Sequence, residues 1–256
     1  MIKKYKISVP KSTLNEIYKK VRNFPWSAAQ NMNGWEYGTN LNYLKNISKY
    51  WITKYNWKKF ENKINSFKNY KTKVEDINLH FIFEKSKNPN SKPLLLLHGW
   101  PGSITEFLDI IPRLAHPEKF GGKIEDGFDI IVPSLPGFGF SSQIKKALGP
   151  RKIGKILNKF MVKNLGYKNY FVQGGDWGAT IAGWIGLDSS KNCKGIHINC
   201  LPLRHPKGTK NTKEKKWEKK FNFDQIMQEG YRTQQATKPQ TLSYAMIDSP
   251  VGTAAW

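Results

Sequence analysis

The spacing of hydrophobic residues changes along the chain and divides it into three ranges. In residues 1–85, apolar positions recur every three or four residues, which is typical of helices that pack through one face. This spacing predicts helices at residues 14–21, 41–51 and 57–67. Ser12 stands just before the first pattern and is expected to be the N-cap of that helix. Residues 72–84 then alternate between polar and apolar around Glu75 and Asp76, which predicts two strands joined by a turn.

Residues 86–200 contain short, mostly apolar runs, and helical spacing lies between them. The runs are at residues 93–97, 128–132, 170–172 and 195–199. Such runs indicate strands that are buried on both faces of a parallel sheet. The helical patterns lie around residues 107–114, 152–164 and 179–185. Strands that alternate with helices predict an α/β fold with a doubly wound sheet. Residues 201–256 begin with a lysine-rich segment and continue with helical patterns.

A glycine-rich turn follows the run at residues 170–172. Gly174 and Gly178 stand two residues on either side of Asp176. This spacing between a strand and a helix is typical of a nucleophile elbow, in which the backbone packs too closely for side chains at the two flanking positions. The usual nucleophile is serine, whereas an aspartate here would attack carbon and form an ester. A structural turn with an incidental acid fits these six residues equally well.

A second loop ends the run at residues 93–97, with the sequence His98-Gly-Trp-Pro. The carboxyl ends of parallel strands lie at the same edge of a sheet, so this loop and Asp176 are expected to meet. The backbone N–H groups of Trp100 and Trp177 would then converge beside the carboxylate as an oxyanion hole. We expect His98 to be structural, fixing the turn rather than acting as a base.

We expect no metal and no cofactor. Cys193 and Cys200 lack metal-ligand spacing and are predicted to be buried, reduced thiols. The loop at residues 137–142 has two of the glycines of a dinucleotide fingerprint but lacks the third, and no acidic residue ends a following strand.

The formal net charge is +23, which suggests nucleic acid or an anionic surface as a partner. However, only five of the 42 basic residues are arginine, the residue that recognises bases and phosphates best, and the lysines are scattered. We therefore expect no nucleic-acid partner. No apolar run approaches the roughly 18 residues of a membrane span, and the first residues lack a secretory signal. A cytoplasmic location, or one peripheral to endomembranes without an anchor in this chain, is the expectation, and the oligomeric state is left open.

Longer motifs connect these features to a known family. They lie at residues 35–38, 61–67, 98–103, 133–141, 174–178 and 235–241. Through them the chain resembles the microsomal-type epoxide hydrolases, including the juvenile hormone epoxide hydrolases. The resemblance implies an α/β-hydrolase fold that lacks its last core strands. It also implies a helical amino-terminal domain at residues 1–85, a hydrolase core at 86–200 and a partial helical lid at 201–256.

The resemblance also implies roles for individual residues. Asp176 would be the nucleophile, and Trp100 and Trp177 would supply the oxyanion-hole amides. Tyr231 is similar to one of two lid tyrosines that protonate the epoxide oxygen, since a phenol is a proton donor at neutral pH. The substrate would be a small hydrophobic epoxide and the product a vicinal diol.

The family's histidine base, its charge-relay acid and its second lid tyrosine would all follow residue 256. None of the five histidines lies where the family carries its base; they are His80, His98, His116, His197 and His205. We therefore expect either a fragment of a longer hydrolase or an inactive copy, with an unpaired sheet edge and no useful turnover. Two alternatives stay open from the sequence: a haloalkane dehalogenase, which also uses an elbow aspartate, and a non-catalytic basic binding protein.

Overall fold

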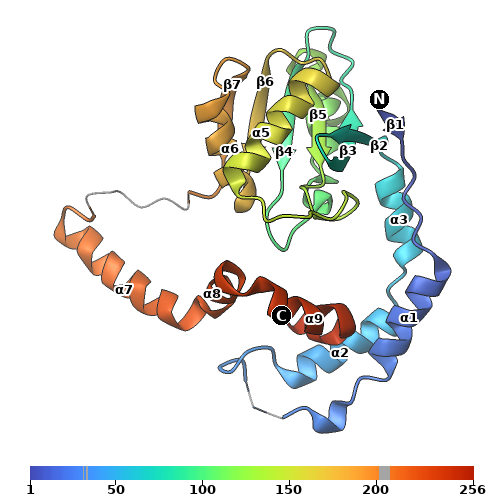
Figure 1. The fold of residues 1–256 in the computed structure, drawn as a ribbon, viewed down its shortest axis with the longest axis vertical. Helices are drawn as coiled ribbons and strands as arrows, with labels where there is room; N and C mark the ends of the chain where they lie inside the picture. Colours follow the sequence, from blue (N-terminus) through green and yellow to red (C-terminus); the bar gives the residue numbers. More distant parts are fainter. Residues whose placement is uncertain (31, 33, 202–207) are drawn as a thin grey trace. The chain divides into compact units, whose positions relative to one another are not determined.

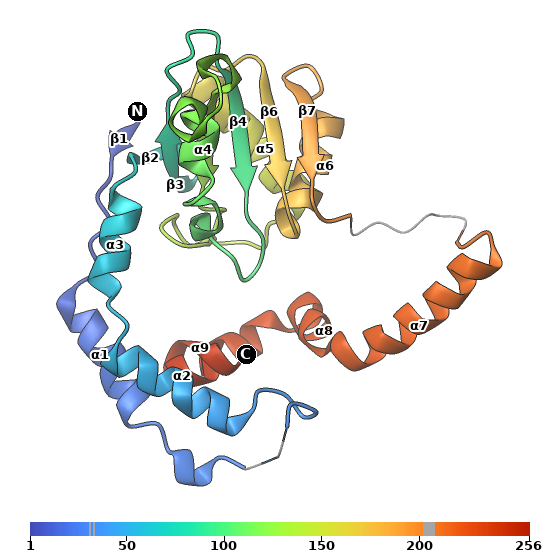
Figure 2. The same ribbon diagram turned by 180° about the vertical axis from the view of Figure 1, so that it is seen from behind.

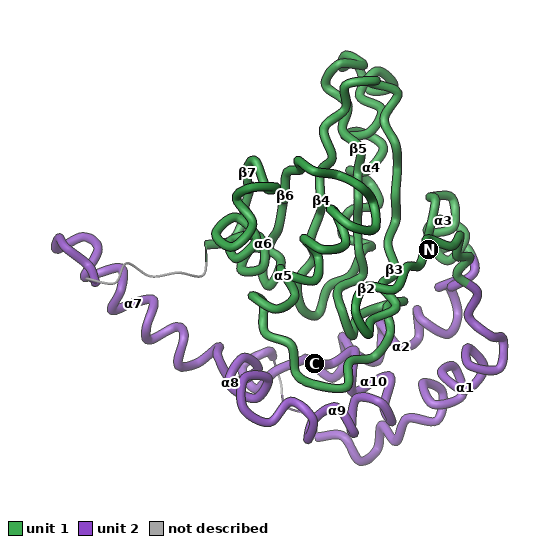
Figure 3. The backbone as a smooth tube through the Cα atoms, turned by 45° about the horizontal axis from the view of Figure 1, so that its top comes forward, with its two compact units in different colours: residues 1–7, 59–203 green, residues 8–58, 204–256 purple. Residues whose placement is uncertain are grey.

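A computed structural model describes residues 1–30, 32, 34–201 and 208–256. The chain forms two compact units, and each unit joins two separate stretches of sequence (Figure 3). Residues 1–7 and 59–203 form a unit built on a sheet, and residues 8–58 and 204–256 form a helical unit. From the sequence we expect three consecutive domains, with limits at residues 85 and 200, and this division stays a prediction.

The sheet unit contains one sheet of seven strands among the described residues. The strands are β1 (Lys3–Lys4), β2 (Asn69–Val74), β3 (Ile77–Glu84), β4 (Lys92–Leu97), β5 (Phe128–Pro133), β6 (Tyr170–Gly174) and β7 (Cys193–Ile198). Their order is β1-β2-β3-β5-β4-β6-β7. The pairs from β1 to β5 are antiparallel, and β5, β4, β6 and β7 run parallel. The strand pair predicted from the alternation in residues 72–84 is confirmed as β2 and β3.

Helices cover the two faces of this sheet. The helices α5 (Pro150–Lys159) and α6 (Trp177–Asp188) lie over one face, and α4 (Ile111–Ala115) lies over the other (Figures 1 and 2). This arrangement follows from the parallel strands, because each needs a crossover that returns the chain to the same edge. A π-helical turn (Phe160–Asn164) continues α5 and completes the helix predicted at 152–164.

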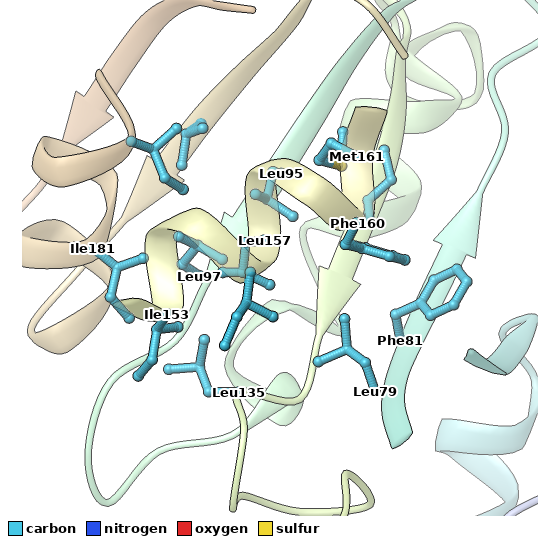
Figure 4. Packing of buried hydrophobic residues seen from close by; sticks show 14 of the residues in the cluster. Leu79, Phe81, Leu95, Leu97, Leu135, Ile153, Leu157, Phe160, Met161 and Ile181 are labelled. Atoms are coloured by element: carbon cyan, nitrogen blue, oxygen red, sulfur yellow. The ribbon is translucent and has the colours of Figure 1, made fainter. Parts of the chain in front are cut away.

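Each face of the sheet carries its own hydrophobic core. Between the sheet and α5, the side chains of Leu95, Leu157 and Phe160 are fully buried (Figure 4). On the opposite face, Ile111 of α4 packs with strand residues such as Ile130. The apolar runs of the sequence are therefore explained by strands that bury side chains in both cores.

The helical unit takes its helices from both halves of the sequence. They are α1 (Lys11–Arg22), α2 (Leu41–Thr53), α7 (Thr212–Gln228), α8 (Gly230–Thr237), α9 (Pro239–Asp248) and α10 (Pro250–Ala255). Helix α10 packs against both α1 and α2, and its Val251 is fully buried. Lys20 Nζ of α1 lies 3.0 Å from Asp248 Oδ1. Helix α3 (Trp57–Asn65) begins in this unit and continues into the sheet unit. In the described parts of the chain, no helix has the length and apolar content that crossing a membrane requires.

Three expectations from the sequence are wrong in detail. Helix α1 begins at Lys11 after Pro10, so Ser12 lies inside the helix and is not its N-cap. The helix expected at 107–114 is split into the 3-10 helix η2 (Ile104–Phe107) and α4, because Pro112 is tolerated only in the first turn of a helix. Cys193 is buried, but Cys200 is exposed because it lies beyond the end of β7; both are free thiols.

Candidate functional site

Asp176 lies in the sharp turn between β6 and α6. Its φ angle is +49°, a region that non-glycine residues occupy only under constraint. A β-carbon at Gly174 would collide with the carbonyl of Gly178, and one at Gly178 would collide with the carbonyl of Leu97. Backbone therefore packs directly on backbone at both positions. The backbone has the strand–turn–helix shape of an elbow, as the sequence predicted, and the role of Asp176 as its nucleophile stays a prediction.

The carboxylate of Asp176 is exposed and meets the loop after β4. The backbone N–H of Trp100 donates a hydrogen bond to Asp176 Oδ1 at 2.8 Å. This approach needs a glycine at position 99, because a β-carbon there would overlap the Asp176 side chain. The structure thus brings together two of the residues that the sequence placed in the site.

Trp177 is the first residue of α6, so its backbone N–H has no partner within the helix. No described residue accepts a hydrogen bond from this N–H group. The helix N-terminus therefore presents a donor next to Asp176, and the partial positive charge of the helix dipole lies there as well. Its assignment to the oxyanion hole stays a prediction.

His98 is buried and both of its ring nitrogens are engaged. Nε2 accepts a hydrogen bond from the Leu135 N–H at 3.1 Å, so Nδ1 carries the proton and donates to the Gly99 carbonyl at 2.9 Å. Burial lowers the pKa of His98, with the Gly99 hydrogen bond opposing this effect. The ring is thus a neutral tie between the loops after β4 and β5, in agreement with the structural role expected for it.

The other described histidines have no hydrogen bond with Asp176. His80 is buried between Ser134 and Asn69, and His116 bonds to Glu84. His197 lies on β7. His205 falls outside the described residues.

Tyr231 belongs to α8 in the helical unit, and 52% of its surface is exposed. Asp176 belongs to the sheet unit. The pairing of these two side chains, and the role of Tyr231 as proton donor, therefore stay predictions.

Sequence reasoning missed one residue of the site, Glu106. Its carboxylate oxygen Oε1 accepts a hydrogen bond from the Ser103 N–H at 3.1 Å, within the turn that follows Trp100. The signal was available, because Ser103-x-x-Glu106 has the pattern of a capping box, and the structure contains that box at the start of η2.

Glu106 also lines a cavity of about 790 Å³ on the α4 side of the sheet. The cavity wall is mainly apolar, with Leu96 and Phe171 among its residues, and His197 and Asn199 add polar groups. Among the residues that the structure describes, no group of three His, Cys, Asp or Glu side chains is placed to hold a metal ion.

Comparison with known proteins gives matches along the whole chain. Residues 2–107 match a family model described as epoxide hydrolase N terminus, and residues 92–245 match one described as alpha/beta hydrolase fold. Epoxide hydrolase 1 of Oryctolagus cuniculus is 34% identical, in an alignment that covers 100% of this chain and 61% of that protein. Juvenile hormone epoxide hydrolase 1 of Ctenocephalides felis is 33% identical, with coverage of 100% and 58%.

A solved structure shows the same similarity. The crystal structure of juvenile hormone epoxide hydrolase from the silkworm Bombyx mori superposes with a TM-score of 0.88 at 30% sequence identity. The superposition covers 100% of this chain and 64% of that one. The chain thus spans 58% to 61% of the length of the two curated relatives.

Proposed function

Because this chain belongs to the epoxide hydrolase family of the α/β-hydrolase fold, we propose that Asp176 opens an epoxide by forming an ester with it. The observation that carries the proposal is the hydrogen bond from the Trp100 N–H to Asp176 Oδ1. It orients an exposed carboxylate that already lies at the tip of an elbow. A haloalkane dehalogenase and a basic binding protein have no comparable support.

The first step follows from this orientation. Oδ1 is held by the Trp100 amide, so Oδ2 is the free oxygen and attacks one epoxide carbon. The new Oδ2–carbon bond forms as the ring carbon–oxygen bond breaks, and the ring oxygen leaves as an alkoxide. That oxygen takes a proton, for which we propose Tyr231 as the donor, because a phenol is protonated at neutral pH.

The second step is hydrolysis of the ester. Water attacks the Asp176 carboxyl carbon, and negative charge develops on Oδ1. The Trp100 amide already donates to this oxygen, and we propose that the Trp177 amide becomes the second donor. Removing one such donor from an oxyanion hole costs about 10²–10³ in rate. The bond between the carboxyl carbon and Oδ2 then breaks, so the diol leaves with Oδ2 as one of its hydroxyl oxygens, and the oxygen of water takes its place in the Asp176 carboxylate.

This second step needs a base to remove a proton from water. No described histidine bonds to Asp176, and the His98 ring is already engaged through both nitrogens. We therefore propose that this chain by itself forms the ester much faster than it hydrolyses it.

The test is to incubate the chain with styrene oxide and to measure its intact mass over time. We expect a mass increase of one epoxide that persists for hours, and peptide mapping should place it on Asp176. The matched control, Asp176→Asn, should gain no adduct. The absence of both an adduct and diol with the unmodified chain would contradict the nucleophile, whereas rapid formation of diol would contradict only the slow second step.

A further inference from the structure

The turn that carries Trp100 is held by two side chains. His98 bonds to its first part, through the Gly99 carbonyl. Glu106 bonds to its last part, where Oε1 accepts from the Ser103 N–H at 3.1 Å. The two side chains thus hold the two ends of the turn, with Trp100 between them.

The lack of a side chain at Gly102 is what admits this carboxylate. A β-carbon at Gly102 would collide with Glu106 Oε1. Although Glu106 as a residue is exposed, its carboxylate is therefore packed against the backbone of the turn.

A capping box explains only part of this arrangement. It accounts for the hydrogen bond from Ser103, which satisfies the backbone at the start of η2. It does not account for the close packing of the carboxylate against Gly102, inside the turn. The pKa of Glu106 is raised, mainly by burial of the carboxylate, and the charge of Asp176 acts in the same direction.

We propose that Glu106 is a positioning residue for the reaction of Asp176. By holding Ser103 at the end of the turn, its carboxylate keeps the Trp100 N–H pointed at Asp176 Oδ1. This inference rests on the proposed role of Asp176 as nucleophile. Glu106 itself has no bond to the reacting atoms, so it acts through Trp100.

The test compares two substitutions at this position. Glu106→Ala removes the acceptor and should slow the labelling of Asp176 by styrene oxide about tenfold. Glu106→Gln keeps an acceptor oxygen for the Ser103 amide and should restore most of the rate. Asp109→Ala, an exposed position three residues further along the same segment, is the matched control and should label at the original rate.

A second measurement does not depend on the reaction. Hydrogen–deuterium exchange of a peptide that covers residues 99–103 should become faster in Glu106→Ala and stay slow in Glu106→Gln. If the unmodified chain is not labelled at all, the proposed function fails, but this exchange result still tests whether Glu106 holds the turn. Unchanged exchange and unchanged labelling in a folded Glu106→Ala protein would overturn the inference.

Discussion

At the scale of single residues, Asp176 is held in a conformation that its own chemistry does not favour. A positive φ at a non-glycine residue costs of order 1–3 kcal/mol and persists only where the surroundings impose it. Here the contact of Gly174 with Gly178 imposes it, and the result is a carboxylate that projects towards the Trp100 amide. The strained turn therefore makes the carboxylate project away from the backbone around it.

A second residue-scale feature is the buried ring of His80. Asn69 uses its amide nitrogen to bond two backbone carbonyls, so its oxygen must accept from His80 Nε2. Nδ1 then accepts from the Ser134 hydroxyl. Burial, helped by the charge of Lys71, lowers the pKa of His80 to about 3. The ring is therefore neutral in the folded protein over most of the pH range.

This depressed pKa predicts a loss of stability in acid. Below the ordinary histidine pKa of 6.5, the unfolded chain binds a proton at His80 that the folded chain does not bind. The free energy of unfolding should therefore fall as pH drops from 6.5 towards 3, and at pH 5 the loss from this group is about 2 kcal/mol. The free energy of unfolding in urea, measured at pH 7, 6 and 5, tests this prediction.

The control for this measurement is His80→Gln, which keeps a donor and an acceptor but does not titrate. It should be less stable at pH 7 and should show a shallower dependence on pH, since only the other groups remain. Equal pH dependence in the two proteins would refute the assignment of the proton to His80.

How far the sequence predicts the site also depends on individual residues. The contact between Trp100 and Asp176 follows from two glycine-containing motifs that each end a buried strand, so local patterns are sufficient. Glu106 has a local signal too, but a capping box gives no information about the distant Asp176. Tyr231 rests on resemblance alone, because no local pattern connects a helical tyrosine with an elbow.

At the scale of elements, the strands are predictable and their order is not. The run at 93–97 corresponds closely to β4, because a wholly apolar segment of that length fits only a buried strand. The pairing of β3 with β5, however, joins segments that are separated by β4 in the sequence. Which strands become neighbours is decided by the packing of the whole sheet. A local pattern of side chains carries no information about that packing.

The close packing of β6, α6 and β4 around the elbow predicts that an added side chain at Gly178 lowers stability. In Gly178→Ala, the added β-carbon would meet the Leu97 carbonyl, so α6 must shift away from the sheet. Forced overpacking of this kind costs about 1–3 kcal/mol, and backbone can yield less than side chains do. The free energy of unfolding in urea should fall by at least that amount.

Gly183→Ala is the matched control, because Gly183 lies in the same helix and a β-carbon there meets no atom within 4 Å. Replacing an exposed helical glycine with alanine should raise stability by about 0.5–1 kcal/mol. A Gly178→Ala protein as stable as the Gly183→Ala protein would contradict the close packing of the elbow.

At the scale of the whole molecule, the helical unit depends on contacts between distant parts of the sequence. Val251 of α10 is fully buried where α10 meets α1 and α2. The hydroxyl of Thr39 also donates to the Ala255 carbonyl at 2.6 Å. The amino-terminal helices therefore lose part of their packing whenever α10 is displaced.

We expect Val251→Asp to disrupt this packing, because a buried carboxylate without a partner costs several kcal/mol. In hydrogen–deuterium exchange, peptides from α1 and α2 should lose protection while peptides from β4 and β6 keep theirs. Ala254→Asp, at an exposed position of the same helix, should change neither group. Loss of protection in β4 and β6 would show that the two units unfold together.

The contact of α10 with α1 and α2 also sets an order of events on the ribosome. Helices α1 and α2 are complete by Thr53, whereas α10 begins at Pro250. At about 5–20 residues per second, the first helices wait roughly 10–40 s for their partner to be translated. During this interval their apolar faces are open to chaperones and to neighbouring nascent chains, so the yield of folded protein depends on how that delay is managed in the cell.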